Sequence, residues 1–326
     1  MGKYPYTFLT ALGLMIAFLS GCELEQEVAI PDHEPKLTLR LALANAVPDS
    51  THYRSAPYNQ LYIGRSQHVL QADEELEGVT NATVMLYNEA GQAVETYRHT
   101  GMLYGYYQPQ LMNGYYEAVS GYVPEPGKIY TLRATAPGFQ SIEANTRMPQ
   151  PNGMGEVTFT DKEMSYGYFP GIEGTLKVTF QDNPNEQNYY QVQAYPLDSA
   201  QRRMSYYSIT PRRDRTGPEL GMQEQLWLGT MFSDELYNSG QITLSNRVVV
   251  PVSETTWNGK TRHTHYLEVQ VQQLTKDEYL FYKTLQSQRD NDGNPFAEYT
   301  QVHRNVTNGY GVLGGVTISK YLIPIK

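Results

Sequence analysis

The single cysteine of the chain, Cys22, lies where its thiol can take part in covalent chemistry. It follows Leu19, Ser20 and Gly21, which place a hydrophobic residue three positions before the cysteine and then two small residues. This is the pattern of a bacterial lipobox, in which the thiol takes a diacylglycerol and a peptidase cuts before the cysteine. Several acyl chains anchor a protein firmly, where one chain binds reversibly. We therefore expect lipidation at Cys22; the alternative is a secretory signal that is cut elsewhere, with Cys22 incidental.

The segment before Cys22 has the features of a cleaved signal. Lys3 supplies a positive charge, and residues 8–19 form an apolar stretch broken only by a threonine and a glycine. This stretch is shorter than the roughly 20 helical residues that span a bilayer. We predict that residues 1–21 are a lipoprotein signal peptide and that residues 22–36 are an acidic tether.

Two patterns of oxygen and nitrogen ligands could hold a metal ion. His263 and His265 are two residues apart in an expected strand, so their imidazoles share a face and suit a metal if a third ligand comes from elsewhere. Asp290, Asp292 and Asn294 offer the alternating oxygens that calcium prefers. The alternatives are exposed edge-strand histidines and ordinary helix stop signals. We expect no cofactor other than the lipid, and leave calcium or another metal open at these residues.

Tyrosine is over-represented, with 28 Tyr against 9 Phe and 2 Trp. Four adjacent pairs stand out: Tyr106 and Tyr107, Tyr115 and Tyr116, Tyr189 and Tyr190, and Tyr206 and Tyr207. Neighbouring residues in a strand face opposite sides, so each pair is expected to put one ring inside and one outside. Outward rings could stack on a sugar or contact a partner; the alternative is ordinary sheet surface. Tyr106, Tyr107, Tyr115 and Tyr116 are our candidate ligand-binding residues.

Other classes of function are disfavoured by composition and by missing motifs. The formal net charge is −9 and no long basic run occurs, so we expect no nucleic-acid partner. The chain has no Gly-x-Ser-x-Gly, no His-Glu-x-x-His and no phosphate-binding loop. After lipidation of Cys22 no thiol remains for catalysis. We expect a protein that is not an enzyme, although paired carboxylates are not visible in a sequence.

The elements that must position these residues are mainly strands. Leucines alternate over 37–43, and strands separated by Gly and Pro turns follow to residue 146, which predicts an antiparallel β-sandwich over 37–149. Pro149 to Gly153 marks a junction, and a second β-rich domain is predicted over 150–326. Its one predicted helix, about 275–289, starts at a capping box in which Thr275 and Glu278 would each bind a backbone N–H.

Several segments, in their order along the chain, resemble a known family. They are residues 35–39, 82–87, 127–132, 178–182, 188–190, 232–235, 275–285, 294–297 and 305–311. They resemble the Bacteroidetes lipoprotein family filed as domain of unknown function 4249, and residues 127–139 look like the end of a transthyretin-like sandwich. One departure is the loop 195–226, where five arginines between 202 and 215 could meet lipid phosphates or an acidic partner, or simply be solvated.

The resemblance implies an outer-membrane lipoprotein, often encoded beside a TonB-dependent transporter, and no reaction to carry over. Glu23, Glu25 and Glu27 resemble a signal for export to the cell surface; a solvated tether is the alternative. We therefore expect a lipid-anchored, non-enzymatic accessory or ligand-binding partner of such a transporter. A glycan-binding or glycan-processing surface protein and an envelope assembly or structural protein are the alternatives.

Overall fold

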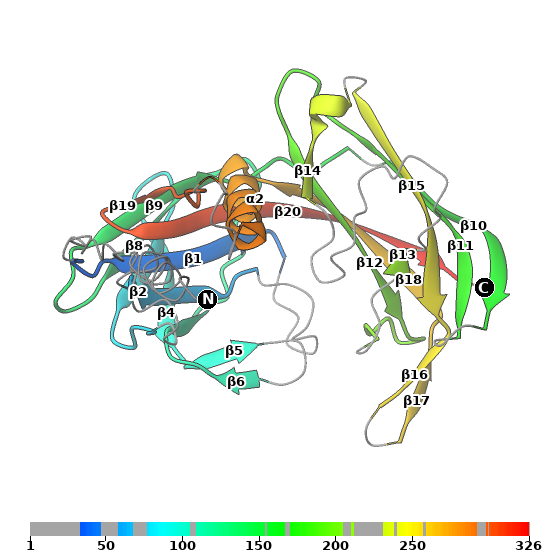
Figure 1. Ribbon diagram of the computed structural model, residues 1–326, viewed down its shortest axis with the longest axis horizontal. Coiled ribbons are helices and arrows are strands. Elements are labelled where there is room, and N and C mark those ends of the chain that lie inside the picture. The colour runs from blue at the N-terminus through cyan, green and yellow to red at the C-terminus, as the bar shows by residue number, and fades with distance from the viewer. Residues whose placement is uncertain are drawn as a thin grey trace, which may run out of the picture. The chain divides into compact units, whose positions relative to one another are not determined.

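The computed structural model describes most of the chain after residue 32 (Figure 1). The described residues are 33–46, 58–67, 77–104, 109–153, 155–166, 170–204, 210–211, 231–237, 240–256, 259–291, 298 and 300–325. The chain divides into two compact units, Met1–Glu34 and Pro35–Lys326. Both sheets, the helix α2 and the cavity lie in the second unit.

One large sheet contains strands from the beginning, middle and end of this unit. Over the described residues its twelve strands lie in the order β14 (Met231–Ser233), β12 (Tyr189–Leu197), β18 (Tyr266–Leu274), β20 (Tyr310–Pro324), β1 (Leu37–Ala44), β2 (Leu61–Arg65), β7 (Tyr115–Ala118), β4 (Ala93–His99), β3 (Thr83–Tyr87), β8 (Ile129–Thr135), β9 (Ile142–Arg147) and β19 (Val306–Thr307). Neighbours are antiparallel except β1 and β20, which pair in parallel from Thr38 and Tyr310 to Ala44 and Val316. The long strand β20 therefore joins the two halves of the sheet.

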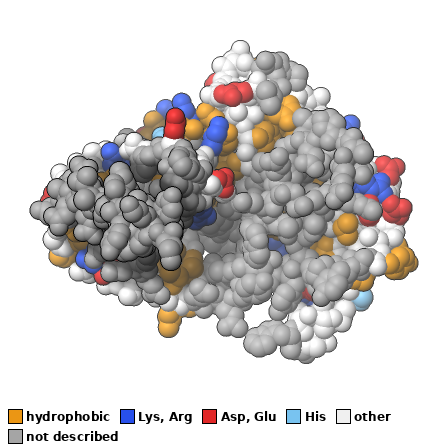
Figure 2. All heavy atoms as spheres, viewed as in Figure 1, with side chains coloured by type: hydrophobic (Ala, Val, Ile, Leu, Met, Phe, Trp, Pro, Cys, Tyr) orange, Lys and Arg blue, Asp and Glu red, His pale blue; other side chains and the backbone are white. Residues whose placement is uncertain are grey.

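A second sheet has four described strands, in the order β10 (Glu156–Ser165), β11 (Gly171–Gln181), β15 (Gln241–Pro251) and β13 (Thr210–Pro211). Ion pairs link its edge strand β10 to the neighbouring strands, because Arg247 on β15 pairs with Glu173 on β11 and with Glu163 on β10. Figure 2 shows acidic and basic side chains gathered at this side of the molecule. Charged side chains on an edge strand oppose pairing with another chain.

Two hairpins and two helical segments complete the described elements. The hairpins are β16 (Ser253–Thr255) with β17 (Thr261–His263), and β5 (Met102–Tyr104) with β6 (Pro109–Leu111). The helical segments are the 3₁₀ turn η2 (Asp234–Leu236) and the α-helix α2 (Lys276–Asp290). In Figure 1, α2 lies across the sheet beside β1 and β20.

Strand β1 is buried on both faces, and the two faces carry different side chains. Leu37, Leu39, Leu41 and Leu43 belong to a first hydrophobic cluster, with residues of β2, β3, β8 and β9. The opposite face presents the small residues Ala42 and Ala44 to a third cluster, which includes Tyr279 of α2. The small side chains leave room for the helix, so the alternation that predicted this strand also defines two layers.

A second cluster lies between the four-stranded sheet and the part of the large sheet formed by β12, β18 and β20. Phe159, Leu176 and Phe180 of the four-stranded sheet pack with Tyr190 and Leu267 of the large one. The structure is therefore mainly β and sandwich-like, as predicted. Its transthyretin-like topology and the domain division at residue 149 stay predictions.

At the start of α2 the structure confirms the predicted cap at Thr275 but not the predicted role of Glu278. The Thr275 hydroxyl accepts a hydrogen bond from the Glu278 backbone N–H at 3.3 Å, as a helix N-cap does. The Thr275 N–H, however, donates to the carbonyl of Gly315 on β20. The Glu278 carboxyl is instead buried against Gly314, where any Cβ would lie 2.1 Å from its Oε2. The capping-box prediction is wrong for the glutamate because β20 takes the backbone donor.

Candidate ligand cavity

A polar cavity of about 840 Å³ is formed by three segments that are far apart in the sequence. They are residues 146–153, from the end of β9 onward, residues 181–190, from the end of β11 to the start of β12, and residues 273–277, from the end of β18 to the start of α2; Gly127 adds to the wall. The volume lies within the roughly 300–1,000 Å³ that is usual for small-molecule sites. We take this cavity as the candidate functional site.

The segment 146–153 is fixed by backbone contacts on both sides. The Gly127 N–H donates to the Met148 carbonyl at 2.9 Å, and the Thr317 hydroxyl of β20 donates to the Pro149 carbonyl at 2.7 Å. Gly127 has a positive φ of +76°, and a Cβ there would lie 2.2 Å from Nε2 of Gln150. Glycine is therefore favoured at 127 by the positive φ, whereas the flexible Gln150 side chain could move away from a Cβ.

The loop 181–190 is organised around one buried amide, Asn188. Its side-chain nitrogen donates to the carbonyls of Asn183 at 3.1 Å and Glu186 at 3.0 Å, and its oxygen accepts from Gln273 of β18 at 2.7 Å. Its backbone N–H donates to the Asp234 carboxylate at 2.8 Å. One side chain thus closes the loop on itself and ties it to the neighbouring strand.

Tyr190 marks the inner end of the same loop. Its hydroxyl donates to Oδ1 of Asp182 at 2.6 Å, and its ring packs in the second cluster. Burial, and then the bond to this carboxylate, raise the pKa of Tyr190. The phenol therefore stays neutral at physiological pH and acts as a hydrogen-bond donor, not as a base.

The wall at the start of α2 is equally constrained. Asp277 accepts from Nε2 of His303 at 2.7 Å and from Nδ2 of Asn305 at 3.1 Å. Asn305 in turn exchanges hydrogen bonds with the backbone of Leu313 on β20. The helix start is held against the sheet, and its carboxylate is already occupied by partners within the protein.

Unused hydrogen-bonding groups remain in this wall. The Asn152 amide interacts with the Tyr190 hydroxyl closely enough to act to lower the pKa of that phenol. Asn152 lines the cavity, is 8% exposed and, among the described residues, makes no well-aligned side-chain hydrogen bond. The same holds for the buried Thr146 hydroxyl. Buried polar groups without a partner cost about 1–3 kcal/mol each and are uncommon in native structures, so they call for an explanation.

The tyrosines that the sequence singled out lie away from this cavity. Tyr116 is 2% exposed, and its hydroxyl donates to the Val79 carbonyl at 2.8 Å. Tyr115 is half-buried, with its ring 5.1 Å from that of Tyr62. Tyr106 and Tyr107 lie outside the described residues. Ligand binding by these residues stays a prediction.

The pair Tyr189 and Tyr190 departs from the expected arrangement of one ring inside and one outside. Both are buried, because the sheet is covered on both faces at this point. Tyr189 stacks on Tyr279 of α2 with ring centroids 4.6 Å apart, whereas Tyr190 packs against Phe180 on the other face.

The candidate metal ligands that the structure describes do not come together in one metal-binding group. His263 is exposed on β17 and His265 is half-buried beyond its end, while Asp290 ends α2 and accepts from Gln286 at 2.6 Å. Asp292 and Asn294 lie outside the described residues, as does Cys22. In the part of the chain that the structure describes, no group of three or more His, Cys, Asp or Glu side chains could hold a metal.

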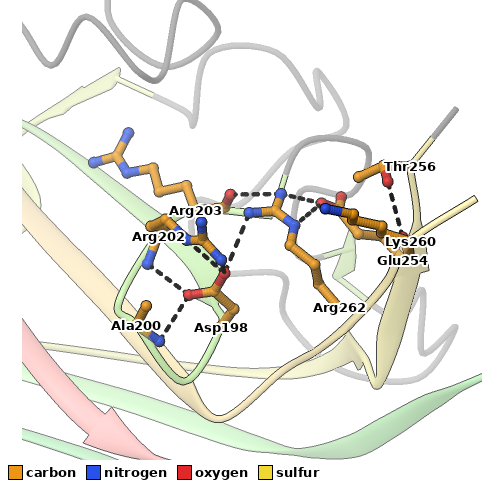
Figure 3. A network of polar contacts seen from close by, with 8 residues as sticks. All are labelled: Asp198, Ala200, Arg202, Arg203, Glu254, Thr256, Lys260 and Arg262. Atoms are coloured by element: carbon orange, nitrogen blue, oxygen red, sulfur yellow. Dashed lines mark hydrogen bonds and ion pairs between the residues drawn. The ribbon is translucent and has the colours of Figure 1, made fainter. Parts of the chain in front are cut away.

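Two arginines of the basic loop are engaged within the protein. Arg202 donates to the Asp198 carboxylate, and Arg203 pairs with Glu268 at 2.5 Å while lying over the Tyr195 ring. Arg262 of β17 reaches the same Asp198 and the carboxylate of Glu254, as Figure 3 shows. The cluster joins the β16–β17 hairpin to the turn after β12. The arginines at 212, 213 and 215 lie outside the described residues.

Comparison with protein families identifies the chain. A family model described as a domain of unknown function (DUF4249) matches residues 55–321. The chain belongs to the DUF4249 family. This match covers the cavity segments, the four-stranded sheet and all of the large sheet except β1 and the last residues of β20. No curated protein matches the chain. Among its described residues, no helix of this DUF4249 protein is long and apolar enough to cross a membrane.

Proposed function

We propose that this DUF4249 protein is an outer-membrane lipoprotein, anchored through lipid on Cys22, that serves as a non-enzymatic accessory of a TonB-dependent transporter. The observation that carries the proposal is the lipobox, which holds the only cysteine of the chain. The compact unit that begins at Pro35 supports it, because the 12 residues between Cys22 and Pro35 are enough for a tether of modest reach. The protein would capture the ligand of the transporter or brace its outer face.

The cavity supports the ligand-capture form of the proposal. A binding protein needs a preformed site whose walls stay in place, and here hydrogen bonds fix each of the three wall segments. Tyr190 is kept neutral and Asp277 is already bonded, so the described walls provide hydrogen-bonding contacts more readily than a general base.

The anchor is tested by fractionation of cells that express the full-length chain or Cys22→Ser. We expect the unaltered protein in the outer-membrane fraction, released only by detergent, and the variant in the soluble fraction. Ser20→Ala keeps a small residue in the lipobox and is the matched control, which should stay with the membrane. Membrane retention of Cys22→Ser equal to that of the control would refute lipid anchoring.

The partnership is tested separately by affinity purification from detergent-solubilised membranes. We expect a TonB-dependent transporter to co-purify with the unaltered protein at a defined ratio. If lipidated protein is recovered without any outer-membrane barrel, the accessory role is wrong even though the anchor stands.

A further inference from the structure

We propose that Arg40 of β1, with Tyr62 of β2 and Tyr115 of β7, binds the carboxylate of a small organic acid on the face of the large sheet opposite the first hydrophobic cluster. These residues do not line the cavity, so this is a second site. The inference goes beyond the proposed function, and neither the lipid anchor nor the transporter enters its test.

The three side chains stand in one row across adjacent strands. Arg40 lies opposite Tyr62 in the pairing of β1 with β2, and Tyr62 lies opposite Tyr115 in the pairing of β2 with β7. Residues directly opposite in antiparallel strands share a face, with Cβ atoms roughly 4.5–5.5 Å apart. Their sequence neighbours point the other way, into the first hydrophobic cluster: Leu39, Leu61 and Tyr116. The row is half-buried on the opposite face.

Arg40 is a cation without a counter-charge. Among the described residues its guanidinium has no hydrogen-bond or ion-pair partner, and it lies 5.2 Å from the centroid of the Tyr282 ring of α2. Arginines of other strands pair with carboxylates: Arg65 with Glu77, Arg98 with Glu117, Arg133 with Glu143 and Arg247 with Glu173. A guanidinium with its fork of donors unused is suited to accept a carboxylate from a ligand.

The unpaired atoms of the row can be reached from solvent. The nitrogens of Arg40 and the hydroxyls of Tyr62 and Tyr115 form no hydrogen bond within the described part of the chain. They are nevertheless not among the buried atoms that lack a partner, which belong to other side chains: Thr146, Asn152 and Glu278. These donors are therefore unpaired because they are open to solvent, and a ligand can approach them without a change in the fold.

Two acids near the row leave the guanidinium of Arg40 free. Burial raises the pKa of Glu278 on α2 to about 7, and the charge of Arg40 opposes this only in part. The Glu278 carboxyl is therefore mainly neutral at pH 6 and does not cancel the charge of Arg40. Glu117, two residues after Tyr115 on the same strand face, is already paired with Arg98.

The two tyrosines offer donors and ring faces beside the cation. The Tyr62 ring lies over two glycines, since a Cβ at Gly64 would be 2.6 Å from its hydroxyl oxygen and one at Gly114 would be 2.8 Å from its Cε2. The Tyr115 ring lies 5.1 Å from it, tilted by 54°. Burial raises the pKa of both phenols, so their hydroxyls stay protonated and can donate. The ring faces suit the carbon skeleton of an acid.

The charge of the row favours a carboxylate over a phosphate. Arg40 supplies one positive charge, which the single negative charge of a carboxylate balances. The planar guanidinium also matches the two oxygens of a carboxylate. A phosphate group carries about 1.5 to 2 negative charges near neutral pH, more than one arginine neutralises.

The test is calorimetric titration of the full-length protein, purified in detergent, at pH 6. The probes are two carboxylates, D-glucuronate and phenylacetate, their neutral counterparts, glucose and 2-phenylethanol, and inorganic phosphate. We expect at least one carboxylate to bind about tenfold or more tightly than its neutral counterpart, because only the carboxylate pairs with Arg40. Binding of glucuronate would indicate an acidic sugar, and binding of phenylacetate an aromatic acid.

Arg40→Met should weaken the binding of that carboxylate about tenfold or more, as loss of a charge-assisted hydrogen bond does. Arg133→Met is the matched control. Arg133 also lies on the large sheet, 5.0 Å from the centroid of the Tyr87 ring, but it is paired with Glu143. The control should bind the carboxylate as the unaltered protein does.

Tyr115→Phe gives a second result if Arg40→Met fails to fold. It removes one hydroxyl and keeps the ring, so we expect it to weaken carboxylate binding about threefold. The proposal is overturned if neither carboxylate binds, if the neutral counterparts bind as tightly, or if no folded variant of Arg40 and Tyr115 alters the affinity. Phosphate binding that depends on Arg40 and exceeds carboxylate binding would also overturn it, because the ligand class would be wrong.

Discussion

Two buried glutamates of this protein sit in opposite surroundings. The Glu95 carboxylate accepts hydrogen bonds from the backbone N–H groups of Val119, Ser120 and Tyr122 and from the Ser120 hydroxyl. Burial raises its pKa, but these bonds outweigh burial, so the pKa of Glu95 lies below its usual value. Glu278 has an unpaired Oε1, and burial raises its pKa to about 7, opposed in part by the charge of Arg40.

The contrast predicts opposite pH dependences of stability. Because the folded protein holds the Glu278 proton more tightly than the unfolded chain, whose value is about 4.5, stability falls as pH rises from about 4.5 through 7. The full effect is about 3 kcal/mol. Glu278→Gln should remove this fall. Urea unfolding at pH 5 and at pH 8 measures it, as the loss of unfolding free energy between the two pH values in the unaltered protein and its absence in the variant.

Glu95→Gln is the matched comparison. Its folded pKa is lowered, so the stability it contributes is present above the unfolded value and is lost as pH falls through the folded one. The substitution should therefore cost stability at pH 8 and cost less near pH 3. If both substitutions changed the pH dependence of stability in the same direction, one of the two pKa shifts would be wrongly assigned.

At the residue scale the sequence identified Thr275 as a helix cap but could not assign Glu278 or Asn152. A capping box places a glutamate at the third helical position, and nothing local shows that β20 will take the backbone donor instead. The residues that line the cavity are ordinary amides and acids, up to about 150 positions apart. Only the break at Pro149 to Gly153 was visible, and it indicated a junction, not a site.

At the scale of elements, the β16–β17 hairpin is held by Arg262. Its guanidinium reaches Glu254, whose side chain is fully buried, and Asp198, and it also donates to the Arg203 carbonyl at 3.1 Å. Burial raises the pKa of Asp198, but bonds from the Arg202 backbone and side chain outweigh burial and hold it below its usual value. The Asp198 carboxylate therefore stays charged beside Arg202 and Arg262.

Arg262→Met should destabilise the protein by about 3 kcal/mol, because it removes the cation from two buried carboxylates. Arg202→Met is the matched control, since Arg202 also binds Asp198 but its side chain is 60% exposed; it should cost less than about 1 kcal/mol. Urea unfolding at pH 7 compares the two. Equal losses of unfolding free energy in the two variants would mean that Arg262 contributes no more than an ordinary surface ion pair does.

Strand β20 shows why one major element escaped prediction. It is the longest strand described, yet Gly311, Gly314 and Gly315 interrupt it, and glycine weakens a strand. Contacts from distant segments require these glycines: a Cβ at 311 would lie 1.8 Å from the Leu39 carbonyl oxygen of β1, and one at 315 would lie 3.0 Å from the Met148 sulfur. The leucines of β1, by contrast, alternate strictly along the sequence, and this pattern alone predicts a strand with one buried face.

At the scale of the whole unit, the continuous sheet predicts that Pro35–Lys326 unfolds as one cooperative body. Leu132 lies in the first hydrophobic cluster and Leu267 in the second, and both are fully buried. Leu132→Ala and Leu267→Ala should each cost about 2–5 kcal/mol and lower the same thermal transition. Calorimetry of the two variants checks this. Two transitions that respond separately would instead support domains divided at residue 149.

The parallel pairing of β1 with β20 sets the order in which the chain can be finished. During synthesis β1 leaves the ribosome early, but the strand that covers its second edge is made 272 residues later, as the pairs Thr38 with Tyr310 and Ala44 with Val316 show. Until then, β1 carries an apolar, unpaired edge, and such edges recruit other chains. Contacts of such long sequence separation also slow folding. A copy that ends before residue 310 therefore keeps this edge of β1 unpaired, and we expect it to aggregate more readily than the complete chain.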